Sequence, residues 1–193
     1  MSIAIIDCGG ANLRSVQHAF QLKGYEANIT TEKTKIGQAS HIVIPGVGSA
    51  GMVMNALNSL KLTSLIKELQ QPVLGICIGM QILYEYSQEQ NTKCLGIING
   101  EIKKLPVEQG IKIPQMGWNE VIFDQSALSN LNNHYYFANS YYAEGSLETA
   151  ALTDYKVTMS SVVIKNNFIG CQFHPEKSSV AGEQFLDYFL GLK

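Results

Sequence analysis

Val73-Leu74-Gly75-Ile76-Cys77-Ile78-Gly79-Met80 carries the clearest structural signal in this sequence. Its first four residues form a short apolar run after Gln71-Pro72, as expected for a strand that is buried on both faces. Glycines two positions before and after Cys77 predict a sharp turn that lifts the thiol away from the backbone. A helical pattern over Met80–Tyr86 follows, so this stretch predicts a strand, a turn and a helix.

The rest of the first half repeats this alternation of strand and helix. Apolar runs at 3–6 and 41–44 predict buried strands, and apolar residues at helical spacing within 13–20 and 57–69 predict helices. The second half changes to short β-like runs at 95–98, 121–123, 135–142, 157–165 and 168–173, with a hairpin turn at Asn166-Asn167 and a last helix from about Ser179. We therefore predict one α/β domain over 1–193, with an open, mostly parallel sheet, helices on both faces and antiparallel additions.

The composition excludes several classes of protein. The chain has 193 residues, of which 46% are hydrophobic and 16% charged, as in a globular protein with a sizeable core. A formal net charge of −2 without runs of like charge argues against nucleic acid or a membrane as the main partner. No apolar stretch reaches the roughly 18 residues that span a bilayer, and the start lacks a signal-peptide pattern. We expect a cytoplasmic protein.

Cys77 lies in the pattern Gly-x-nucleophile-x-Gly, with cysteine as the nucleophile. A helix beginning directly after Cys77 would favour the thiolate, because the positive end of the helix lies beside the sulfur. The backbone N–H of Ile78 would then be placed to bind an oxyanion. The alternative is a buried cysteine whose neighbouring glycines only tighten the packing of strand and helix.

A thiolate nucleophile also needs a base and a group that orients the base. Of the four histidines, only His174 has an acidic partner at a telling spacing, in Phe173-His174-Pro175-Glu176. The proline drives His174 towards extended geometry, in which side chains two positions apart point to the same side. Glu176 can therefore approach the ring of His174. The alternative is a loop histidine beside a surface glutamate.

A glycine-rich turn, Pro45-Gly46-Val47-Gly48, follows the expected strand at 41–44. Its backbone could supply a second oxyanion donor near Val47, because the glycines allow close approach. It lacks the pattern of a nucleotide phosphate loop. Because this turn, Cys77 and His174 all follow apolar strands, we expect them at the carboxyl edge of one sheet. No cluster has metal-ligand spacing, so we predict neither a metal nor an organic cofactor.

These residues together resemble the triad class of glutamine amidotransferases. The matching strings are 45–48, Gly75-Ile76-Cys77-Ile78-Gly79-Met80-Gln81 and Phe173-His174-Pro175-Glu176-Lys177-Ser178. Within that class the chain most resembles the glutaminase subunits of imidazole glycerol phosphate synthases. The segments that carry this narrower resemblance are Ile6-Asp7, 12–16, 114–119 and 176–178. The likeness runs nearly from end to end.

The resemblance implies a catalytic triad of Cys77, His174 and Glu176, with oxyanion donors at Val47 and Ile78. It also implies a substrate, glutamine, whose hydrolysis releases ammonia to a (β/α)₈-barrel cyclase subunit in a heterodimer of histidine biosynthesis. The cyclase makes imidazole glycerol phosphate and an aminoimidazole carboxamide ribonucleotide. The residues that match glutamine-binding positions are Gly46, Gly48, Gln81, Glu89, Ser140 and Tyr141, and those that match partner-facing positions are Asn12 and Trp118.

The chain departs from the family pattern at Cys8, Ala11 and Asn139, where the family usually has Tyr, Gly and His. None of these positions belongs to the triad, but they leave other assignments open. One is a paralogous amidotransferase subunit that serves another synthase. Apart from these departures, the alternatives are a free-standing γ-glutamyl hydrolase or a cysteine peptidase of the same fold, and a non-catalytic regulatory subunit, which the presence of a nucleophile, a base and an orienting acid disfavours.

Overall fold

The apolar strands of the first half form the parallel part of a nine-stranded sheet, with the order β2-β1-β3-β4-β13-β12-β11-β8-β9. The structure is a computed structural model, and it describes all residues except 10–11, 47, 108–109 and 125. Each neighbouring pair from β2 to β13 runs parallel. These strands are β1 (Ser2–Ile6), β2 (Glu26–Thr30), β3 (His41–Ile44), β4 (Val73–Ile76) and β13 (Phe168–Cys171).

The other part of the sheet is antiparallel and comes from the second half of the chain. The hairpin of β12 (Thr158–Lys165) and β13 pairs Lys165 with Phe168, and Asn166 in its turn has φ +54°. This confirms the turn expected at Asn166-Asn167. The strands β11 (Thr149–Asp154), β8 (Gln115–Phe123) and β9 (Asn133–Asn139) continue the sheet.

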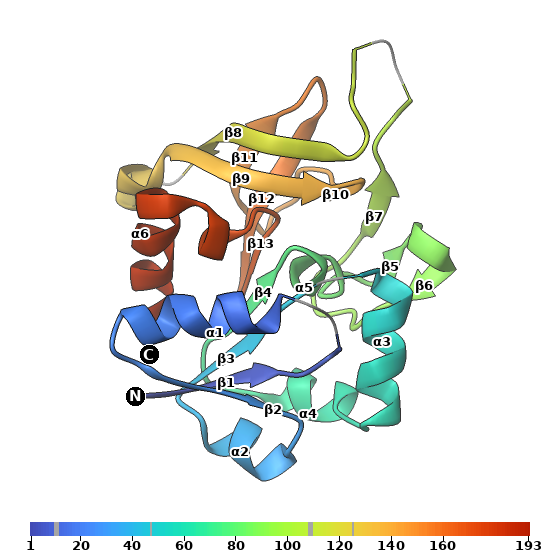
Figure 1. Cartoon of the computed structure of the whole chain (residues 1–193). Coiled ribbons are helices and arrows are strands. Elements are labelled where there is room, and N and C mark those ends of the chain that lie inside the picture. Colours follow the sequence, from blue (N-terminus) through green and yellow to red (C-terminus); the bar gives the residue numbers. More distant parts are fainter. Residues whose placement is uncertain (10–11, 47, 108–109, 125) are drawn as a thin grey trace.

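Helices cover both faces of the parallel strands, as predicted (Figure 1). On one face lie α1 (Leu13–Leu22) and α6 (Ser179–Leu190), where the rings of Phe20 and Phe189 are 6.4 Å apart. The crossovers that contain α2 (Lys33–Gln38) and α4 (Thr63–Glu68) lie on the other face. Because right-handed crossovers that run in opposite directions along a sheet fall on opposite faces, the strand order itself produces this arrangement.

A small second sheet has the order β10-β7-β5-β6 and lies beside the carboxyl edge of the large one. Its strands are β5 (Tyr86–Ser87), β6 (Thr92–Lys93), β7 (Glu101–Lys104) and β10 (Tyr141–Ala143). The 3-10 helix η1 (Glu89–Asn91) connects β5 and β6, and α3 (Ala50–Ser59) contacts it. A further 3-10 helix, η2 (Ser126–Leu131), precedes β9. The small sheet thus brings β10 and Glu89 to the same edge as Cys77.

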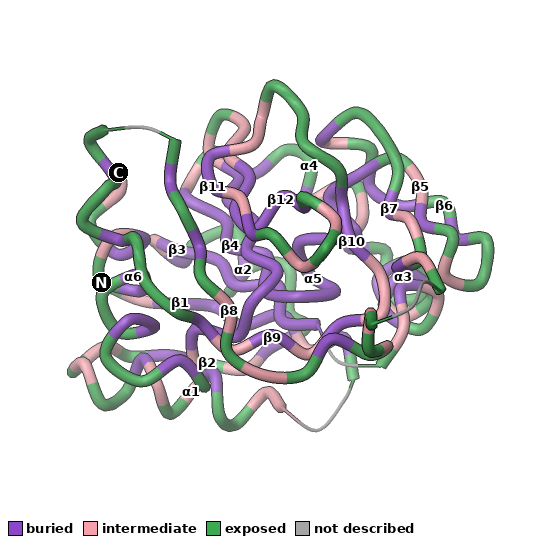
Figure 2. Tube along the Cα trace, turned by 90° about the horizontal axis from the view of Figure 1, so that it is seen from above, coloured by how far each residue is buried: buried purple, intermediate pink, exposed green. Residues whose placement is uncertain are grey.

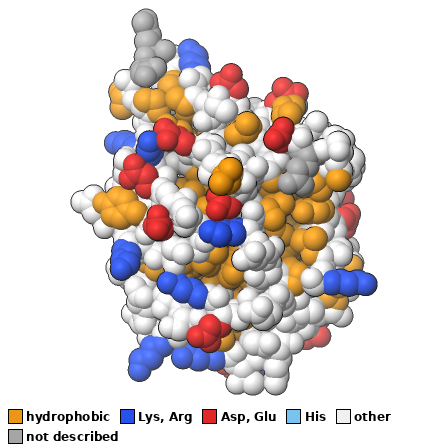
Figure 3. Space-filling view, turned by 180° about the vertical axis from the view of Figure 1, so that it is seen from behind, with side chains coloured by type: hydrophobic (Ala, Val, Ile, Leu, Met, Phe, Trp, Pro, Cys, Tyr) orange, Lys and Arg blue, Asp and Glu red, His pale blue; other side chains and the backbone are white. Residues whose placement is uncertain are grey.

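The core lies between the sheet and its helices, where the central strands are buried and exposed residues lie on the outer helices and loops (Figure 2). Every residue of β3, β4 and β13 is buried. On the face seen in Figure 3, acidic and basic side chains are interspersed. Among the helices that the structure describes, none is long and apolar enough to cross a membrane.

Four local expectations were wrong. The helix expected over Met80–Tyr86 is the short α5 (Ile78–Gln81), and Tyr86 already belongs to β5. Residues 95–98 form no strand, since 95–96 are irregular and 97–98 are bends. The helical stretch at 57–69 is two helices separated at Lys61, which has φ +54°. The run at 135–142 is divided between β9 and β10, which belong to different sheets. In each case tertiary packing overrides a short apolar pattern.

Candidate active site

Cys77 lies in a strained turn between β4 and α5. Its backbone has φ +54° and ψ −108°, which is an unfavourable conformation for a residue with a side chain and costs about 1–3 kcal/mol. The N–H of Cys77 donates to the carbonyl oxygen of Cys171 at 2.7 Å, which ties the turn to β13. Gly79 allows close packing here, since a Cβ on it would lie 1.8 Å from the carbonyl oxygen of Ile44. The predicted strand–nucleophile–helix turn is therefore present.

The helix after Cys77 has only four residues. So short a helix aligns few peptide dipoles, and its field at the sulfur is smaller than the sequence led us to expect. Besides His174, polar groups of Ala138 and Gln172 contact the sulfur. The thiol donates to the carbonyl oxygen of Ala138 at 3.9 Å, and the Gln172 amide Nε2 donates to Cys77 Sγ at 3.6 Å.

His174 follows β13, one strand away from Cys77 in the sheet. Its backbone is extended, with φ −101° and ψ 96°, as the following proline predicts. Glu176, in the 3-10 helix η3 (Pro175–Lys177), places Oε1 2.8 Å from His174 Nδ1, which confirms the contact expected from their spacing. The N–H of His174 donates to the carbonyl oxygen of Tyr136 at 2.8 Å, and the hydroxyl of Ser178 donates to the carbonyl oxygen of His174 at 2.7 Å.

The protonation of His174 is set by its two side-chain neighbours. Burial alone would lower the pKa of His174, but hydrogen bonding to Cys77 and Glu176, together with their charges, raises this pKa to about 10. At neutral pH the ring is therefore an imidazolium with an N–H on both nitrogens. Because Nδ1 faces Glu176, Nε2 is the nitrogen left for Cys77 and for a substrate.

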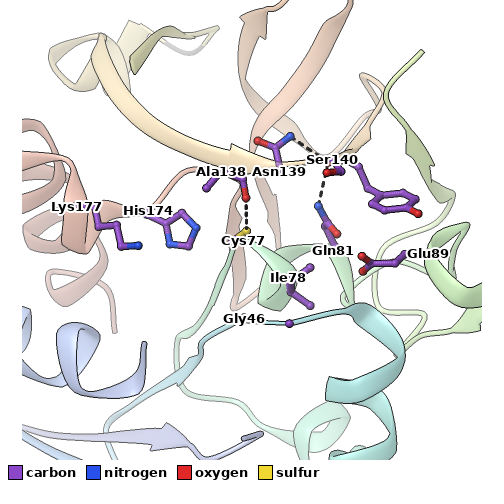
Figure 4. A pocket seen from close by; sticks show the side chains of 12 residues that line it. Gly46, Cys77, Ile78, Gln81, Glu89, Ala138, Asn139, Ser140, His174 and Lys177 are labelled. Carbon is purple, nitrogen blue, oxygen red and sulfur yellow. Dashed lines mark hydrogen bonds between the residues drawn. The ribbon is translucent and has the colours of Figure 1, made fainter. Parts of the chain in front are cut away.

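A cavity of about 290 Å³ opens over Cys77 and His174 (Figure 4). The predicted oxyanion and substrate residues that the structure describes all line it: Gly46, Gly48, Ile78, Gln81, Glu89, Ser140 and Tyr141. Val47 lies outside the described residues. Ala138, Asn139 and Lys177 complete the wall. In Figure 4, His174 and Lys177 lie on one side of Cys77, and Gln81 and Glu89 lie on the other.

Acceptor oxygens without a partner lie on the Gln81 side of the cavity. The Gln81 Nε2 group donates to the carbonyl oxygen of Tyr141 at 3.0 Å, and the Asn139 Nδ2 group donates to the same oxygen at 3.1 Å. The side-chain oxygens of Gln81 and Asn139 are buried and have no hydrogen-bond partner in the described part of the chain. Because such groups are costly when left unpaired, they are suited to accept hydrogen bonds from a ligand.

The two positions expected to face a partner have different surroundings. Asn12 precedes α1, but its amide donates to Glu176 Oε1 instead of capping the helix. Trp118 is 51% exposed on β8 and packs edge-on against Tyr136 of β9, with ring centroids 6.2 Å apart. Among the described residues, no group of three His, Cys, Asp or Glu side chains is placed to hold a metal ion.

Sequence reasoning missed three polar residues of this site: Gln172, Asn139 and Lys177. Gln172 carried a usable signal, because it is a polar residue at the end of an apolar strand and two positions before His174, on the same side of an extended chain. Asn139 was noted only as a departure from the family pattern. The exposed Lys177 carried no signal beyond its place in the string that resembles the family.

Comparison with known proteins identifies the family of the chain. A family model described as glutamine amidotransferase class-I matches residues 4–190. The imidazole glycerol phosphate synthase subunit HisH of Haemophilus influenzae is 41% identical over an alignment of 194 positions, which covers 98% of this chain and 97% of that protein. The subunit of the same name from Bacteroides fragilis is 42% identical over an alignment of 196 positions, which covers 100% of both chains.

A solved structure supports the same fold. A crystal structure of a glutamine amidotransferase matches 97% of this chain and 96% of its own with a TM-score of 0.78, at 15% sequence identity. At that identity the likeness concerns the fold alone. Since the family model spans nearly the whole chain and the sequence relatives align from end to end, this chain belongs to the class-I glutamine amidotransferase family.

Proposed function

We propose that this chain is the glutaminase subunit of an imidazole glycerol phosphate synthase, in histidine biosynthesis. It hydrolyses glutamine to glutamate and ammonia, and a partner subunit consumes the ammonia. The observation that carries this proposal is that Cys77 and His174 line one cavity, while Glu176 contacts the ring of His174. The relatives that share the chain's full length are named as subunits of that synthase.

In the first half of the proposed reaction, Cys77 Sγ attacks the side-chain carbonyl carbon of glutamine. The carbonyl oxygen becomes an oxyanion, which the N–H of Ile78 stabilises, because the first N–H groups of a helix have no acceptor within it. His174 Nε2 gives its proton to the amide nitrogen, the C–N bond breaks and ammonia leaves. A γ-glutamyl thioester on Cys77 remains.

In the second half, water takes the place of ammonia. His174, now neutral, accepts a proton from the water as its oxygen attacks the thioester carbon. The C–S bond breaks, glutamate is released and Cys77 regains its thiolate beside the imidazolium of His174. Glu176 accepts the Nδ1–H hydrogen bond throughout, which fixes the orientation of the ring and stabilises its positive charge.

Recognition of glutamine is assigned to the opposite side of the cavity. The α-ammonium group of an amino acid is a strong donor, and the unpaired oxygens of Gln81 and Asn139 and the carboxylate of Glu89 offer acceptors there. One oxygen of Glu89 already accepts from the N–H of Ala50 at 2.7 Å, which fixes the carboxylate at the wall. Gly46, Gly48, Ser140 and Tyr141 contribute backbone at this wall, and a second oxyanion donor is proposed at Val47.

The partner is proposed to be a (β/α)₈-barrel synthase that docks on β8 and β9. Met116 and Trp118 are 66% and 51% exposed on one face of β8. Met116 pairs across the strands with Ala138, and Trp118 pairs with Tyr136. Because Ala138 lines the catalytic cavity, this apolar face is continuous with the site where ammonia forms. Asn12 reaches Glu176 from a different element at the same edge of the sheet and is assigned to the same interface.

We further propose that 1–193 acts as one domain in the cytoplasm. The support for one domain is that strands from both halves of the chain share the large sheet. The support for the cytoplasm is that the relatives of the chain are named as subunits of a biosynthetic synthase. Glutamine is the only small-molecule substrate that the site is proposed to bind, and neither a metal nor a cofactor takes part in the steps above.

Substitution of the nucleophile tests the division of labour between the two subunits. In a complex with the barrel synthase, Cys77→Ala should abolish glutamine-dependent synthesis and leave synthesis from added ammonium salts intact. Cys94→Ala, which removes another buried thiol away from the cavity, is the matched control and should leave both activities unchanged. Loss of the ammonia-dependent activity in Cys77→Ala would contradict the proposal. Retention of the glutamine-dependent activity would remove Cys77 from the mechanism.

A further inference from the structure

Gln172 is a buried polar residue to which the mechanism above gives no role. It follows β13 directly, and its side chain is completely shielded from solvent. Because β13 and β4 run parallel with Cys171 paired to Ile76, the residues after them, Gln172 and Cys77, lie beside each other. The amide Nε2 of Gln172 is 3.6 Å from Cys77 Sγ, which is within the range of an N–H···S hydrogen bond.

The orientation of this amide is fixed by a chain of hydrogen bonds that begins at a backbone carbonyl. The Tyr141 carbonyl oxygen can only accept, so the group of Gln81 that lies 3.0 Å from it must be the NH₂. The same NH₂ lies 2.9 Å from the Gln172 side chain, so the atom of Gln172 that faces it must be the oxygen. The NH₂ of Gln172 is therefore left facing the sulfur.

The contacts of the Cys77 sulfur favour different protonation states. The carbonyl oxygen of Ala138 can accept a hydrogen bond only from the thiol, so this contact favours the protonated sulfur. The Gln172 amide donates to the sulfur, so this contact favours the thiolate. The helix after Cys77 has only four residues and contributes a small field. The titratable groups around the sulfur are His174 with Glu176 behind it, Lys177 and Glu89 at the cavity wall, and the buried Cys171.

We propose that Gln172 is a further catalytic residue, which donates a hydrogen bond to the Cys77 sulfur and stabilises the thiolate that attacks the substrate. Gln81 holds Gln172 in the required orientation, so the side of the cavity assigned to glutamine is connected to the nucleophile. The inference rests on the proposed role of Cys77. A buried neutral donor is suited to this task, since it stabilises the thiolate without adding a charge that would compete with His174.

The test is the pH dependence of Cys77 alkylation by iodoacetamide in the full chain, because alkylation reports the thiolate. In Gln172→Leu the midpoint of the rate should rise by about one pH unit, as expected from the loss of one hydrogen bond to a charged group. Gln172→Glu keeps an oxygen for Gln81 but replaces the donor by a negative charge, and its midpoint should rise further. Glutaminase kcat/KM should fall by about tenfold or more in both variants.

Gln71→Leu is the matched control. Gln71 lies just before the other end of β4, and its amide donates to the carbonyl oxygen of Ile36 at 3.2 Å. The substitution removes the same kind of hydrogen bond away from the cavity, so the alkylation midpoint should not change. Unchanged midpoints in both Gln172 variants would overturn the proposal.

A measurement on the native side chain covers the case in which a variant does not fold. In wild-type protein, the side-chain amide NMR signal of Gln172 should shift over the same pH range in which alkylation begins, and it should not do so in Cys77→Ala. A Gln172 side-chain amide signal that does not shift with pH in the wild-type protein would also overturn the inference. Because these readouts follow Cys77 itself, they stand apart from the question of whether glutamine is the substrate.

Discussion

Each residue of the proposed triad is held by a contact from a different part of the chain. The N–H of Cys77 donates to Cys171 of β13, and the N–H of His174 donates to Tyr136 of β9. Glu176 receives the amide of Asn12, 164 positions away in the sequence. The side chains are thus positioned by backbone groups and by a residue at the start of α1. This preorganisation allows a small active site to work without large rearrangement of the reacting groups.

The carboxylate of Glu176 should control the charge of His174. Glu176→Gln removes a negative charge and a strong acceptor, so the pKa of His174 should fall from about 10 by about 1–2 units. As the pH rises, His174 in Glu176→Gln would therefore lose its proton at a lower pH than His174 in the wild-type protein. The ring proton signals of His174 in an NMR titration measure this shift, with Glu183→Gln on the exposed surface of α6 as the matched control. An unchanged titration in Glu176→Gln would contradict the assigned contact.

Alanine substitutions of His174 and Glu176 should differ in their effect on turnover. His174→Ala removes the proposed proton carrier, whereas Glu176→Ala removes only the group proposed to orient it. Glutaminase kcat should therefore fall further in His174→Ala, with losses on the order of 10²–10⁴-fold. Steady-state glutamate release measures both variants. An equal or larger loss in Glu176→Ala would mean that Glu176 does more than orient the ring.

At the scale of elements, the turn after β4 depends on close contact between α5 and β3. A Cβ on Gly79 would lie 1.8 Å from the backbone oxygen of Ile44, and a backbone atom cannot move aside cheaply. Gly79→Ala should therefore reduce the free energy of unfolding by more than about 3 kcal/mol, measured by urea unfolding. Gly37→Ala in α2 meets no atom within 4 Å and should add about 0.5–1 kcal/mol instead. Equal stability of the two variants would contradict this packing.

The exposed face of β8 and β9 should carry the contact with the synthase. Trp118→Ala is expected to weaken the complex by about 30-fold, since large exposed aromatic residues are often the strongest contributors to an interface. Isothermal titration with the barrel subunit measures this change. Leu147→Ala removes a fully exposed apolar side chain from the loop between β10 and β11 and is the control. Equal affinities of the two variants would place the interface elsewhere.

The sequence predicted the elements whose signals are local. The strands 41–44 and 73–76, the turn at Cys77 and the His174–Glu176 contact follow from apolar runs, flanking glycines and a proline. The strand β2 was missed because its alternating polar and apolar residues also suit other structures. Contacts such as Gln81 to Gln172, 91 positions apart, depend on the order of strands in the sheet, and no local pattern encodes that order.

At the scale of the whole molecule, His41 couples pH to the stability of the fold. It opens β3, and its ring lies 5.0 Å from that of Phe189 in α6. Burial lowers the pKa of His41 from 6.5, and neither ring nitrogen has a hydrogen-bond partner in the described part of the chain. Below pH 6.5 the unfolded chain therefore binds a proton that the folded chain binds less readily, so stability falls as the pH falls.

Substitution of His41 tests this coupling. The free energy of unfolding should decrease between pH 7 and pH 5 in the wild-type protein and decrease less in His41→Leu, which cannot be protonated. His18→Gln changes an exposed histidine of α1 and should retain the wild-type dependence. Urea unfolding at several pH values measures all three proteins. A wild-type dependence in His41→Leu would assign the acid sensitivity to other groups.

Hydrolysis of glutamine for a partner synthase is the proposed activity of this site. Its most direct test is the rate of glutamate release from glutamine by the purified chain, alone and with the barrel synthase and its acceptor. We expect a low rate for the chain alone, a large increase in the complete complex, and loss of both rates in Cys77→Ala. A high rate that the partner does not change would rule out a partner-dependent subunit and favour a free-standing glutaminase or hydrolase.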